Sequence, residues 1–386
     1  MNITCVGGGP AGLMFAILAG RAGHRVTVLE QRTPAESFGW GVVFWDGLLK
    51  ALDTHDPQTA GAVRSEAYRW NDQVVTVRGA DEVRLPSYGY SMGRRRLLEL
   101  LVSQAVQAGA TFQKGSFTGD PDELGADLVV AGDGVNSGLR RRHSFGTRLA
   151  RGRNKFIWLG TDKEFTSFTF PFVDTPSGWL WGHAYGYADG ASTFVVETSP
   201  ETWSGLGFAT SDAPATVRRL EELFADALEG HHLQLRASPF DGHPWTEFVE
   251  VRNERWRVGN VVLLGDAAHT THFTIGSGTR LAMEDAMALA DALAAEPDLD
   301  STLSRYDEGR REDLRGVQRV ARRSARWFER VPRYIDRPAP EFATLMENRR
   351  SPVMAHLPVG AYLRLTGTAA NLPMIEAPLR RLLSRL

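Results

Sequence analysis

The sequence has little cysteine, little net charge and no long apolar run, and each absence excludes a class of protein. The single cysteine, Cys5, rules out an internal disulfide and a cysteine-based metal site, which fits a reducing compartment such as the cytoplasm. A formal net charge of −2 argues against a protein that binds nucleic acid or a membrane surface as a whole. No segment reaches the ~18 continuous apolar residues of a membrane span, and the first strand begins too early to leave room for a signal peptide. With 386 residues, 42% of them hydrophobic, we expect a soluble cytoplasmic protein long enough for two domains or one large interleaved unit.

A strand–turn–helix–strand pattern opens the chain. Residues 3–30 read as a strand, a glycine-rich turn, a buried helix and a second strand. Gly7, Gly9 and Gly12 fit the spacing G-x-G-x-x-G. In this motif the first glycine permits the turn, the second lets a pyrophosphate approach the backbone, and the third lets helix and strand pack closely. We therefore predict a dinucleotide site; the alternative is a glycine-rich turn without a ligand.

Residues at the ends of these elements complete the predicted site. Glu30 ends the second strand and should bind a pair of ribose hydroxyls, and we assign the neighbouring Arg32 to the same site. Free N–H groups at the start of the helix, including that of Ala11, favour an anion. Arg94 stands at the start of a later helix, where a cation is unfavourable unless an anion lies beside it. Arg94 is therefore a further cofactor candidate, with a solvated basic turn as the alternative.

Two more glycine-rich turns follow buried strands. Residues 126–131 lead into a Gly-Asp-Gly turn, which lacks the full phosphate fingerprint and is expected to contribute to the first site. Residues 260–264 lead into a second turn, after which a helix begins near Thr279. The cofactor contacts assigned in these turns are Asp133, Asp266, Gly276, Gly278 and Thr279. No metal-ligand cluster occurs in the sequence.

The segment 155–198 has a different pattern. Its period-2 and aromatic-rich runs, broken by proline and glycine, predict an antiparallel sheet that bounds a substrate. The odd positions of residues 179–187 are all aromatic: Trp179, Trp181, His183, Tyr185 and Tyr187. Because strand side chains alternate, one face would form a flat wall suited to a planar ligand. The alternative is a sheet face packed on the core.

These patterns predict an α/β fold in three parts. A Rossmann-like dinucleotide-binding domain comprises residues 1–154 and 250–300, a mainly antiparallel β-sheet domain for the substrate is inserted at 155–249, and a helical region covers 301–386. One face of the last region carries arginines at helical spacing and is either solvent-exposed or anion-binding. These arginines include Arg319, Arg322, Arg323 and Arg326.

The three motifs, in this order, resemble those of the single-component flavin-dependent aromatic hydroxylases, and the resemblance covers nearly the whole chain. It implies FAD as cofactor, NADH or NADPH as electron donor, O2 as co-substrate and hydroxylation of an activated aromatic ring. The family roles that fall on this chain are ADP binding at Gly7, Gly9, Gly12 and Glu30, FAD and NAD(P)H binding at Asp133, and contact with the ribityl–pyrophosphate region at Asp266.

Segments 39–46, 183–187 and 260–286 are also similar to those of hydroxylases that act on salicylyl-CoA and 2-aminobenzoyl-CoA. This similarity implies a small-molecule aromatic substrate in the form of an aryl-CoA thioester. Two alternatives are a hydroxylase of a free indole-like or phenolic natural-product intermediate and a non-catalytic flavin-binding protein.

A substrate activated by a hydroxyl or amine needs a group that accepts its proton or a hydrogen bond. His183 and His272 are the leading catalytic candidates, with Tyr185 next; for each histidine the alternative is a structural imidazole. The predicted substrate-binding residues are Trp181, His183, Tyr185 and Phe273.

A thioester carrier would also need a basic surface for its phosphates. Two arginine groups are available: Arg140, Arg141 and Arg142 with Arg151 and Arg153, and the helical set Arg319, Arg322, Arg323 and Arg326.

Overall fold

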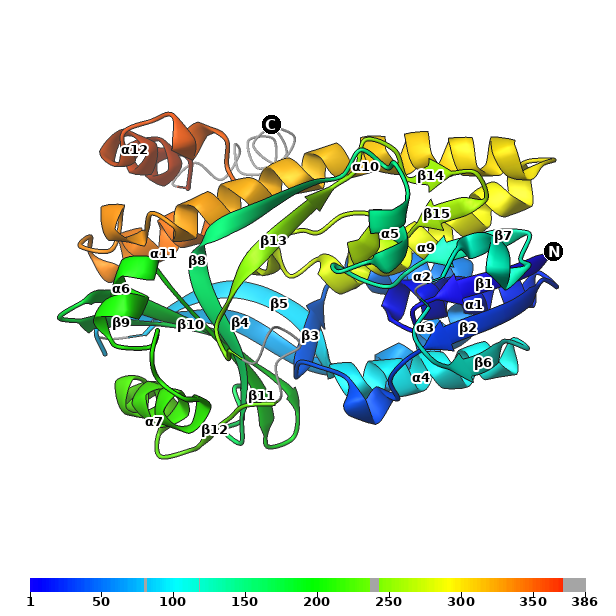
Figure 1. Cartoon of the computed structure of the whole chain (residues 1–386). Helices are drawn as coiled ribbons and strands as arrows, with labels where there is room; N and C mark the ends of the chain where they lie inside the picture. The colour runs from blue at the N-terminus through cyan, green and yellow to red at the C-terminus, as the bar shows by residue number, and fades with distance from the viewer. Residues whose placement is uncertain (80–81, 118, 237–242, 371–386) are drawn as a thin grey trace.

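The computed structural model describes residues 1–79, 82–117, 119–236 and 243–370. Two β-sheets lie end to end, and the 30-residue helix α10 (Leu299–Phe328) runs along both of them (Figure 1). No helix in these ranges is long and apolar enough to cross a membrane. Residues 371–386 of the predicted C-terminal helical region lie outside the described part of the chain.

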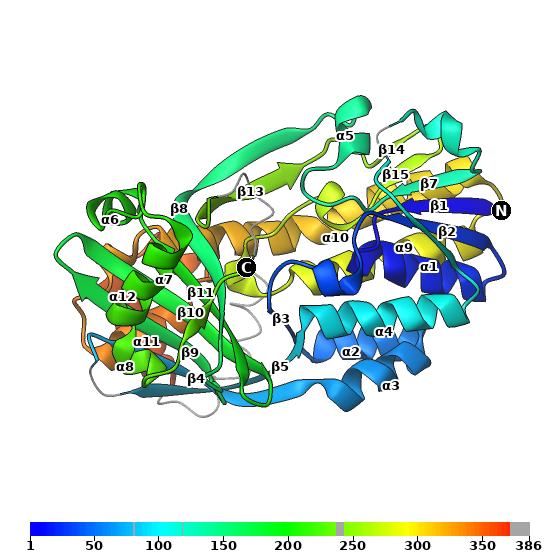
Figure 2. The same ribbon diagram turned by 60° about the horizontal axis from the view of Figure 1, so that its bottom comes forward.

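The first sheet has the strand order β14-β15-β7-β1-β2-β6. Its strands are β1 (Asn2–Val6), β2 (Arg25–Glu30), β6 (Thr111–Lys114), β7 (Leu128–Ala131), β14 (Arg257–Val258) and β15 (Val261–Leu263). All neighbours are parallel except β14 and β15. Every residue of β7 and β15 is buried, the pattern of a parallel sheet covered on both faces. Helix α1 (Pro10–Arg21) packs between α9 (Gly278–Ala295) and α4 (Arg94–Gln107), as Figure 2 shows.

The parallel strands bring the three sequence motifs to one edge. β1 leads into Gly7, β2 ends at Glu30, β7 leads into Gly132, and β15 leads into the short helix η3 (Gly265–Ala267). Because β1 lies between β2 and β7, and β7 lies beside β15, their carboxyl ends are adjacent. The Rossmann-like α/β fold predicted from the sequence is confirmed.

The second sheet has nine strands and is antiparallel except for the pair β4 and β9. Its strands are β3 (Gly41–Phe44), β4 (Tyr68–Val77), β5 (Val83–Gly93), β8 (Arg148–Thr161), β9 (Phe168–Thr175), β10 (Gly178–Ala188), β11 (Ala191–Thr198), β12 (Leu233–Gln234) and β13 (Thr246–Arg252). Strands β3 to β5 and the start of β8 precede residue 155. The predicted boundary between 1–154 and 155–249 therefore does not separate the two sheets, since long-range strand pairing draws the earlier segment into the second sheet.

The two faces of β10 are covered by different elements. Trp181 belongs to an apolar cluster with Phe172, Phe328 and Phe342, in which the last two come from α10 and α11 (Ala339–Glu347). Leu180 and its alternate neighbours belong to another cluster on the opposite face. Strand alternation thus places the aromatic face toward the C-terminal helices. Other helices are α2 (Asp46–His55), α3 (Pro57–Glu66), α5 (Gly138–Arg142), α6 (Pro200–Gly205), α7 (Ala213–Leu223), α8 (Ala225–Leu228) and α12 (Val359–Ala370).

Candidate active site

The three glycines of the first turn have different surroundings. Gly7 has a positive φ of 107°, and a Cβ there would lie 2.3 Å from the carbonyl oxygen of Gly132. A Cβ on Gly12 would lie 2.1 Å from the carbonyl oxygen of Gly7. A Cβ on Gly9, in contrast, would meet nothing within 4 Å. Gly7 and Gly12 are therefore required by the packing of the chain itself, whereas the space before Gly9 fits a pyrophosphate.

The helix N-termini at this edge also differ. α1 starts after Gly9 and α9 starts after Ser277, and neither has a side-chain cap, so their first N–H groups can bind an anion. The N–H groups of α5 are instead satisfied by Ser137 and by Asp133, whose Oδ2 accepts from Gly138 at 2.7 Å. Asp133 Oδ1 is buried without a hydrogen-bond partner among the described residues, so Asp133 can still accept from a ligand hydroxyl.

The carboxylate of Glu30 lies over the first turn. Its Oε2 accepts from the N–H of Gly8 at 2.6 Å, and its Oε1 accepts from the N–H of Arg32 at 2.8 Å. These bonds fix the carboxylate while leaving lone pairs for a ribose diol. The guanidinium of Arg32 lies over the ring of Phe38, 4.0 Å from its centroid, so the contact of Arg32 within the site is made by its backbone.

Asp266 and Arg94 face each other across the edge of the sheet. Asp266 is exposed to solvent, yet desolvation by the surrounding protein raises the pKa of its carboxyl group. The nearby charges of His269 and Arg94 act in the opposite direction but do not outweigh this effect. These two observations place Asp266 in a recess and not on an open surface. Burial likewise lowers the pKa of Arg94, and the nearby Asp266 partly offsets this effect. The guanidinium of Arg94 makes no hydrogen bond within the described ranges. Arg94 thus has its donors free for a phosphate or flavin oxygen.

The remaining assigned cofactor residues line the same edge. Ala11 contacts the third motif, since a Cβ on Gly265 would lie 3.0 Å from that of Ala11. Gly276 has a φ of 60°, and a Cβ there would lie 2.5 Å from the Trp45 ring, so the fold itself requires this glycine. Gly278 faces open space, and the half-buried Thr279 lies in the first turn of α9. Together these features fit FAD.

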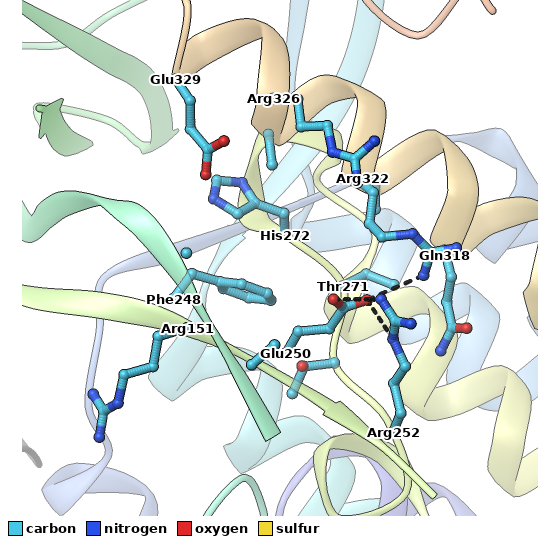
Figure 3. A pocket seen from close by; sticks show the side chains of 15 residues that line it. Arg151, Phe248, Glu250, Arg252, Thr271, His272, Gln318, Arg322, Arg326 and Glu329 are labelled. Carbon is cyan, nitrogen blue, oxygen red and sulfur yellow. Dashed lines mark hydrogen bonds and ion pairs between the residues drawn. The ribbon is translucent and has the colours of Figure 1, made fainter. Parts of the chain in front are cut away.

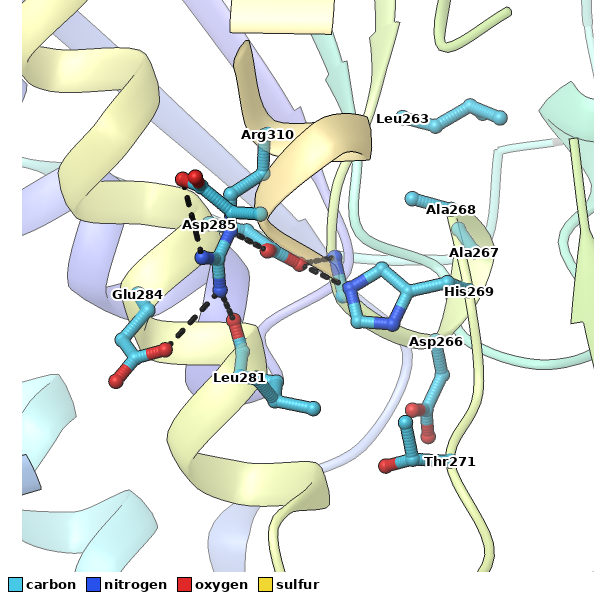
Figure 4. A network of polar contacts seen from close by, with 12 residues as sticks. Leu263, Asp266, Ala267, Ala268, His269, Thr271, Leu281, Glu284, Asp285 and Arg310 are labelled. Carbon is cyan, nitrogen blue, oxygen red and sulfur yellow. Dashed lines mark hydrogen bonds and ion pairs between the residues drawn. The ribbon is translucent and has the colours of Figure 1, made fainter. Parts of the chain in front are cut away.

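A buried ion network holds the third motif in place (Figure 4). Asp285 is fully buried and accepts from His269 at 2.8 Å, from the N–H of Gly265 at 3.1 Å and from Arg310 at 2.6 Å. Burial alone would raise the pKa of Asp285, but His269 and Arg310 outweigh it and lower the pKa. The network ties the turn at Gly265 to both α9 and α10.

Arg140 joins the second motif to the third and is not the surface phosphate ligand predicted from the sequence. It is 3% exposed, and its guanidinium donates to the carbonyl of Ala267 at 3.0 Å and to that of Val135. The prediction was wrong because a five-residue helix, α5, turns this one arginine inward.

Three side chains of the second sheet donate to a buried carboxylate. Glu197 is 1% exposed and accepts from Trp181 Nε1 at 3.0 Å, His183 Nε2 at 3.2 Å and Asn154 Nδ2 at 2.8 Å. Burial opposes ionisation of Glu197, but hydrogen bonds and the nearby His183 and His272 lower its pKa. Burial also lowers the pKa of His183, against the opposing effect of Glu197. At neutral pH the pair therefore consists of a carboxylate and a neutral imidazole.

Phe273 lies between the two candidate histidines. Its ring centroid is 5.5 Å from that of His183 and 4.4 Å from that of His272, which also contacts Phe248. Burial lowers the pKa of His272 to about 4. The structure thus brings His183 of β10 next to the adjacent residues His272 and Phe273, which come much later in the sequence.

Tyr185 and Trp181 have their polar groups occupied. The hydroxyl of Tyr185 donates to the carbonyl of Gly41 at 2.8 Å, and burial raises its pKa. Trp181 is 2% exposed and its ring stacks between Phe172 and Phe328. Tyr185 can bound a ligand with its ring, and Trp181 contributes through its hydrogen bond to Glu197.

Comparison with known proteins agrees with this geometry. A model of the FAD binding domain family matches residues 99–324, more than half of the chain, and a model of an NAD(P)-binding Rossmann-like domain matches residues 5–35. The chain belongs to the FAD-binding family of flavin-dependent aromatic hydroxylases. The cofactors of this hydroxylase are FAD and NAD(P)H.

Two relatives resemble the hydroxylase over most of its length. Salicyloyl-CoA 5-hydroxylase from Streptomyces sp is 39% identical over 349 residues, which are 87% of this chain and 66% of that protein. 3-Hydroxy-4-methyl-anthranilyl-(aryl-carrier protein) 5-monooxygenase from Streptosporangium sibiricum is 38% identical over 337 residues, 86% of this chain and 90% of that protein. The solved structure of 2-methyl-3-hydroxypyridine-5-carboxylic acid oxygenase shares the fold with a TM-score of 0.66 at 17% identity, covering 93% of this chain and 94% of that one.

Sequence reasoning missed Glu197 and Arg349. Glu197 is the one carboxylate in the otherwise apolar and hydroxylic strand β11, which is the signal that could have revealed it. Arg349 is 7% exposed and donates to Ser324 at 2.9 Å, to the carbonyl of Thr274 at 2.8 Å and to that of Met346 at 2.8 Å. It therefore fixes the segment beside Phe273 to the C-terminal helices, a role that nothing in its local sequence indicates.

Two substitutions in the first glycine motif should have different effects on FAD binding and on stability. Gly9→Val should give a folded protein that is isolated without FAD, because Gly9 has an ordinary φ of −78° and its Cβ would enter only the ligand space. Gly12→Ala should lower the free energy of unfolding by about 1–3 kcal/mol or more, because its methyl overlaps a backbone oxygen. Flavin absorbance and urea unfolding of the FAD-free proteins measure the two effects; a yellow Gly9→Val protein would contradict the assignment.

The lowered pKa of His272 predicts an acid dependence of stability. Between pH 6.5 and about 4 the unfolded chain protonates this histidine and the folded chain does not, so stability is lost as the pH falls. The loss over this window should be about 3 kcal/mol, and His272→Gln should remove it. Urea unfolding at several pH values tests this, with His232→Gln as the exposed control; equal slopes in wild type and His272→Gln would count against a neutral buried His272.

Proposed function

We propose that this hydroxylase acts on an aromatic acyl group held as a thioester and that the reacting ring lies beside Phe273 and His183. The observation that carries the proposal is the buried Glu197–His183 pair within an otherwise aromatic sheet face. Burying a carboxylate among aromatic rings is costly unless other groups donate hydrogen bonds to it. One of the donors here, His183, contacts Phe273, which lies between the third motif and Gly276. The names of the two relatives, both of which specify carrier-bound aryl groups, support the thioester.

The pair defines where the substrate's activating group would bind. When His183 donates from Nε2 to Glu197, the neutral ring leaves Nδ1 as an acceptor. A ring hydroxyl or amine can donate to this nitrogen, which increases electron density in the ring at the moment of oxygen transfer. Bound FAD supplies the reduction and oxygen chemistry, whereas the protein orients the ring, accepts the proton and excludes water.

The roles of the other residues follow from their places. Phe273 and the ring of Tyr185 bound the substrate ring, and His272 lies on the far side of Phe273. Glu197 acts through His183 and is a positioning residue. The requirement for NAD(P)H fits a place in the cytoplasm, as the single cysteine led us to expect.

Flavin reduction tests the substrate class directly. Anaerobic reduction of the FAD-loaded protein by NADH or NADPH should be accelerated by 2-hydroxybenzoyl-CoA or 2-aminobenzoyl-CoA and not by the corresponding free acids. Acceleration by a free acid or by an indole compound, with none by the thioesters, would overturn the proposal in favour of a free aromatic substrate.

Glu197→Gln tests the pair itself. Trp181 Nε1 and His183 Nε2 both donate to Oε2 of Glu197, so the amide oxygen of glutamine can keep both hydrogen bonds. The negative charge that favours a proton on His183 is lost, which makes the imidazole a weaker acceptor. Product formation should fall about 100-fold, while NAD(P)H oxidation continues and FAD content is unchanged. The acid limb of the pH–rate profile should move to lower pH, because Glu197 raises the pKa of His183 against burial.

The matched control is Glu201→Gln, which removes an exposed carboxylate four residues away that pairs with Arg153. Product formation and the pH profile should be those of the wild type. If Glu197→Gln behaves like this control, the pair has no part in the reaction.

A further inference from the structure

A pocket of about 220 Å³ opens between β8, β13, α10 and the segment that follows the third motif (Figure 3). Its mouth carries Arg151 from β8, Arg252 from β13, and Arg322 and Arg326 from α10. Glu250 and Glu329 are the acidic side chains among its lining residues.

The pocket carries an excess of positive charge. Glu250 accepts from Arg252 at 2.6 Å and from Arg322 at 3.1 Å, so one carboxylate is shared by two guanidinium groups. Arg326 makes no ion pair among residues that the structure describes, and Arg151 lies 3.5 Å from Glu247, a long contact for an ion pair. Because arginine donors are planar and fixed, this arrangement suits a phosphate.

The inner end of the pocket leads toward the proposed ring site. Thr270, Thr271 and His272 line it, and the ring of His272 lies against Phe273, which in turn contacts His183. Small side chains occupy the walls, including Ala321 and Ala325 of α10. The ring of His272 therefore separates the inner end of the pocket from Phe273.

Residues from both predicted arginine groups converge here. Arg151 belongs to the first group and Arg322 and Arg326 to the second, although they are about 170 positions apart in the sequence. Arg153 instead pairs with Glu201 at 2.6 Å, and the exposed Arg319 does not line the pocket. The fold thus brings only some members of the two predicted arginine groups to this pocket.

We propose that this pocket binds the phosphate of a phosphopantetheine thioester and directs its acyl end past His272 to the ring site. This inference rests on the proposed function, because it names the carrier of that substrate. A volume of about 220 Å³ is too small to hold a nucleotide in addition to the phosphopantetheine phosphate. The pocket would therefore bind the phosphopantetheine arm, which coenzyme A and an acyl-carrier protein share. The nucleotide or the carrier protein stays outside, against α10.

The test compares 2-hydroxybenzoyl thioesters that differ in their phosphate. KM and kcat are measured with the phosphopantetheine thioester and with the pantetheine thioester, which lacks the phosphate. Wild type should show a KM about tenfold lower for the phosphorylated form, and the double variant Arg322→Ala/Arg326→Ala should abolish this preference with little change in kcat. Arg319→Ala, on the same helix but outside the pocket, should keep it.

Two further arms identify the source of the phosphate. A lower KM for the coenzyme A thioester than for the phosphopantetheine thioester identifies coenzyme A, and a lower KM for the thioester on a carrier protein identifies that protein; both results support the pocket. An unchanged phosphate preference in Arg322→Ala/Arg326→Ala, or an equal loss in Arg319→Ala, overturns it.

Calorimetric titration of the FAD-loaded protein with free phosphopantetheine separates this inference from the proposed function. Binding to wild type that is lost in the double variant supports the pocket even if no thioester is hydroxylated. Turnover of thioesters in wild type without any phosphate preference would sustain the proposed function and refute the pocket.

Discussion

The contact between two glycine backbones determines how the rest of this hydroxylase is arranged. Gly7 lies so close to the carbonyl of Gly132 that a single methyl group would overlap it, and Gly12 lies equally close to Gly7. Because of these contacts, the first and second motifs share one edge and α1 can lie directly against β1. Arg140 then joins the second motif to the third. The N-termini of α1 and α9, which have no side-chain cap, lie at this edge and can bind an anion, and Asp266 and Arg94 interact nearby.

Buried charges at the centre of the molecule are arranged in two ways. Asp285 accepts from Arg310, His269 and a backbone N–H, and this network joins the third motif to α9 and α10. Glu197 accepts from three side chains, one of which is the His183 imidazole beside Phe273. The same principle, that a buried charge needs partners, thus holds the third motif in one place and orients His183 in the other.

Local sequence predicted what local contacts determine. The glycine turns, the parallel strands that lead into them and the alternation of β10 all follow from neighbouring residues, and the structure confirms them. Glu197 escaped prediction because Asn154, one of its partners, lies 43 residues away on another strand. The burial of Arg140, the convergence of Arg151 with Arg322, and the recruitment of β3 to β5 into the second sheet likewise depend on long-range packing that no periodicity encodes.

The central claim is that this protein inserts one oxygen atom from O2 into the ring of an aromatic thioester. The most direct measurement is mass spectrometry of the product formed by the FAD-loaded protein from 2-hydroxybenzoyl thioester, NAD(P)H and isotopically labelled O2. We expect a thioester whose ring carries one labelled hydroxyl. A product without label, or consumption of NAD(P)H and O2 with no change in the thioester, would contradict it.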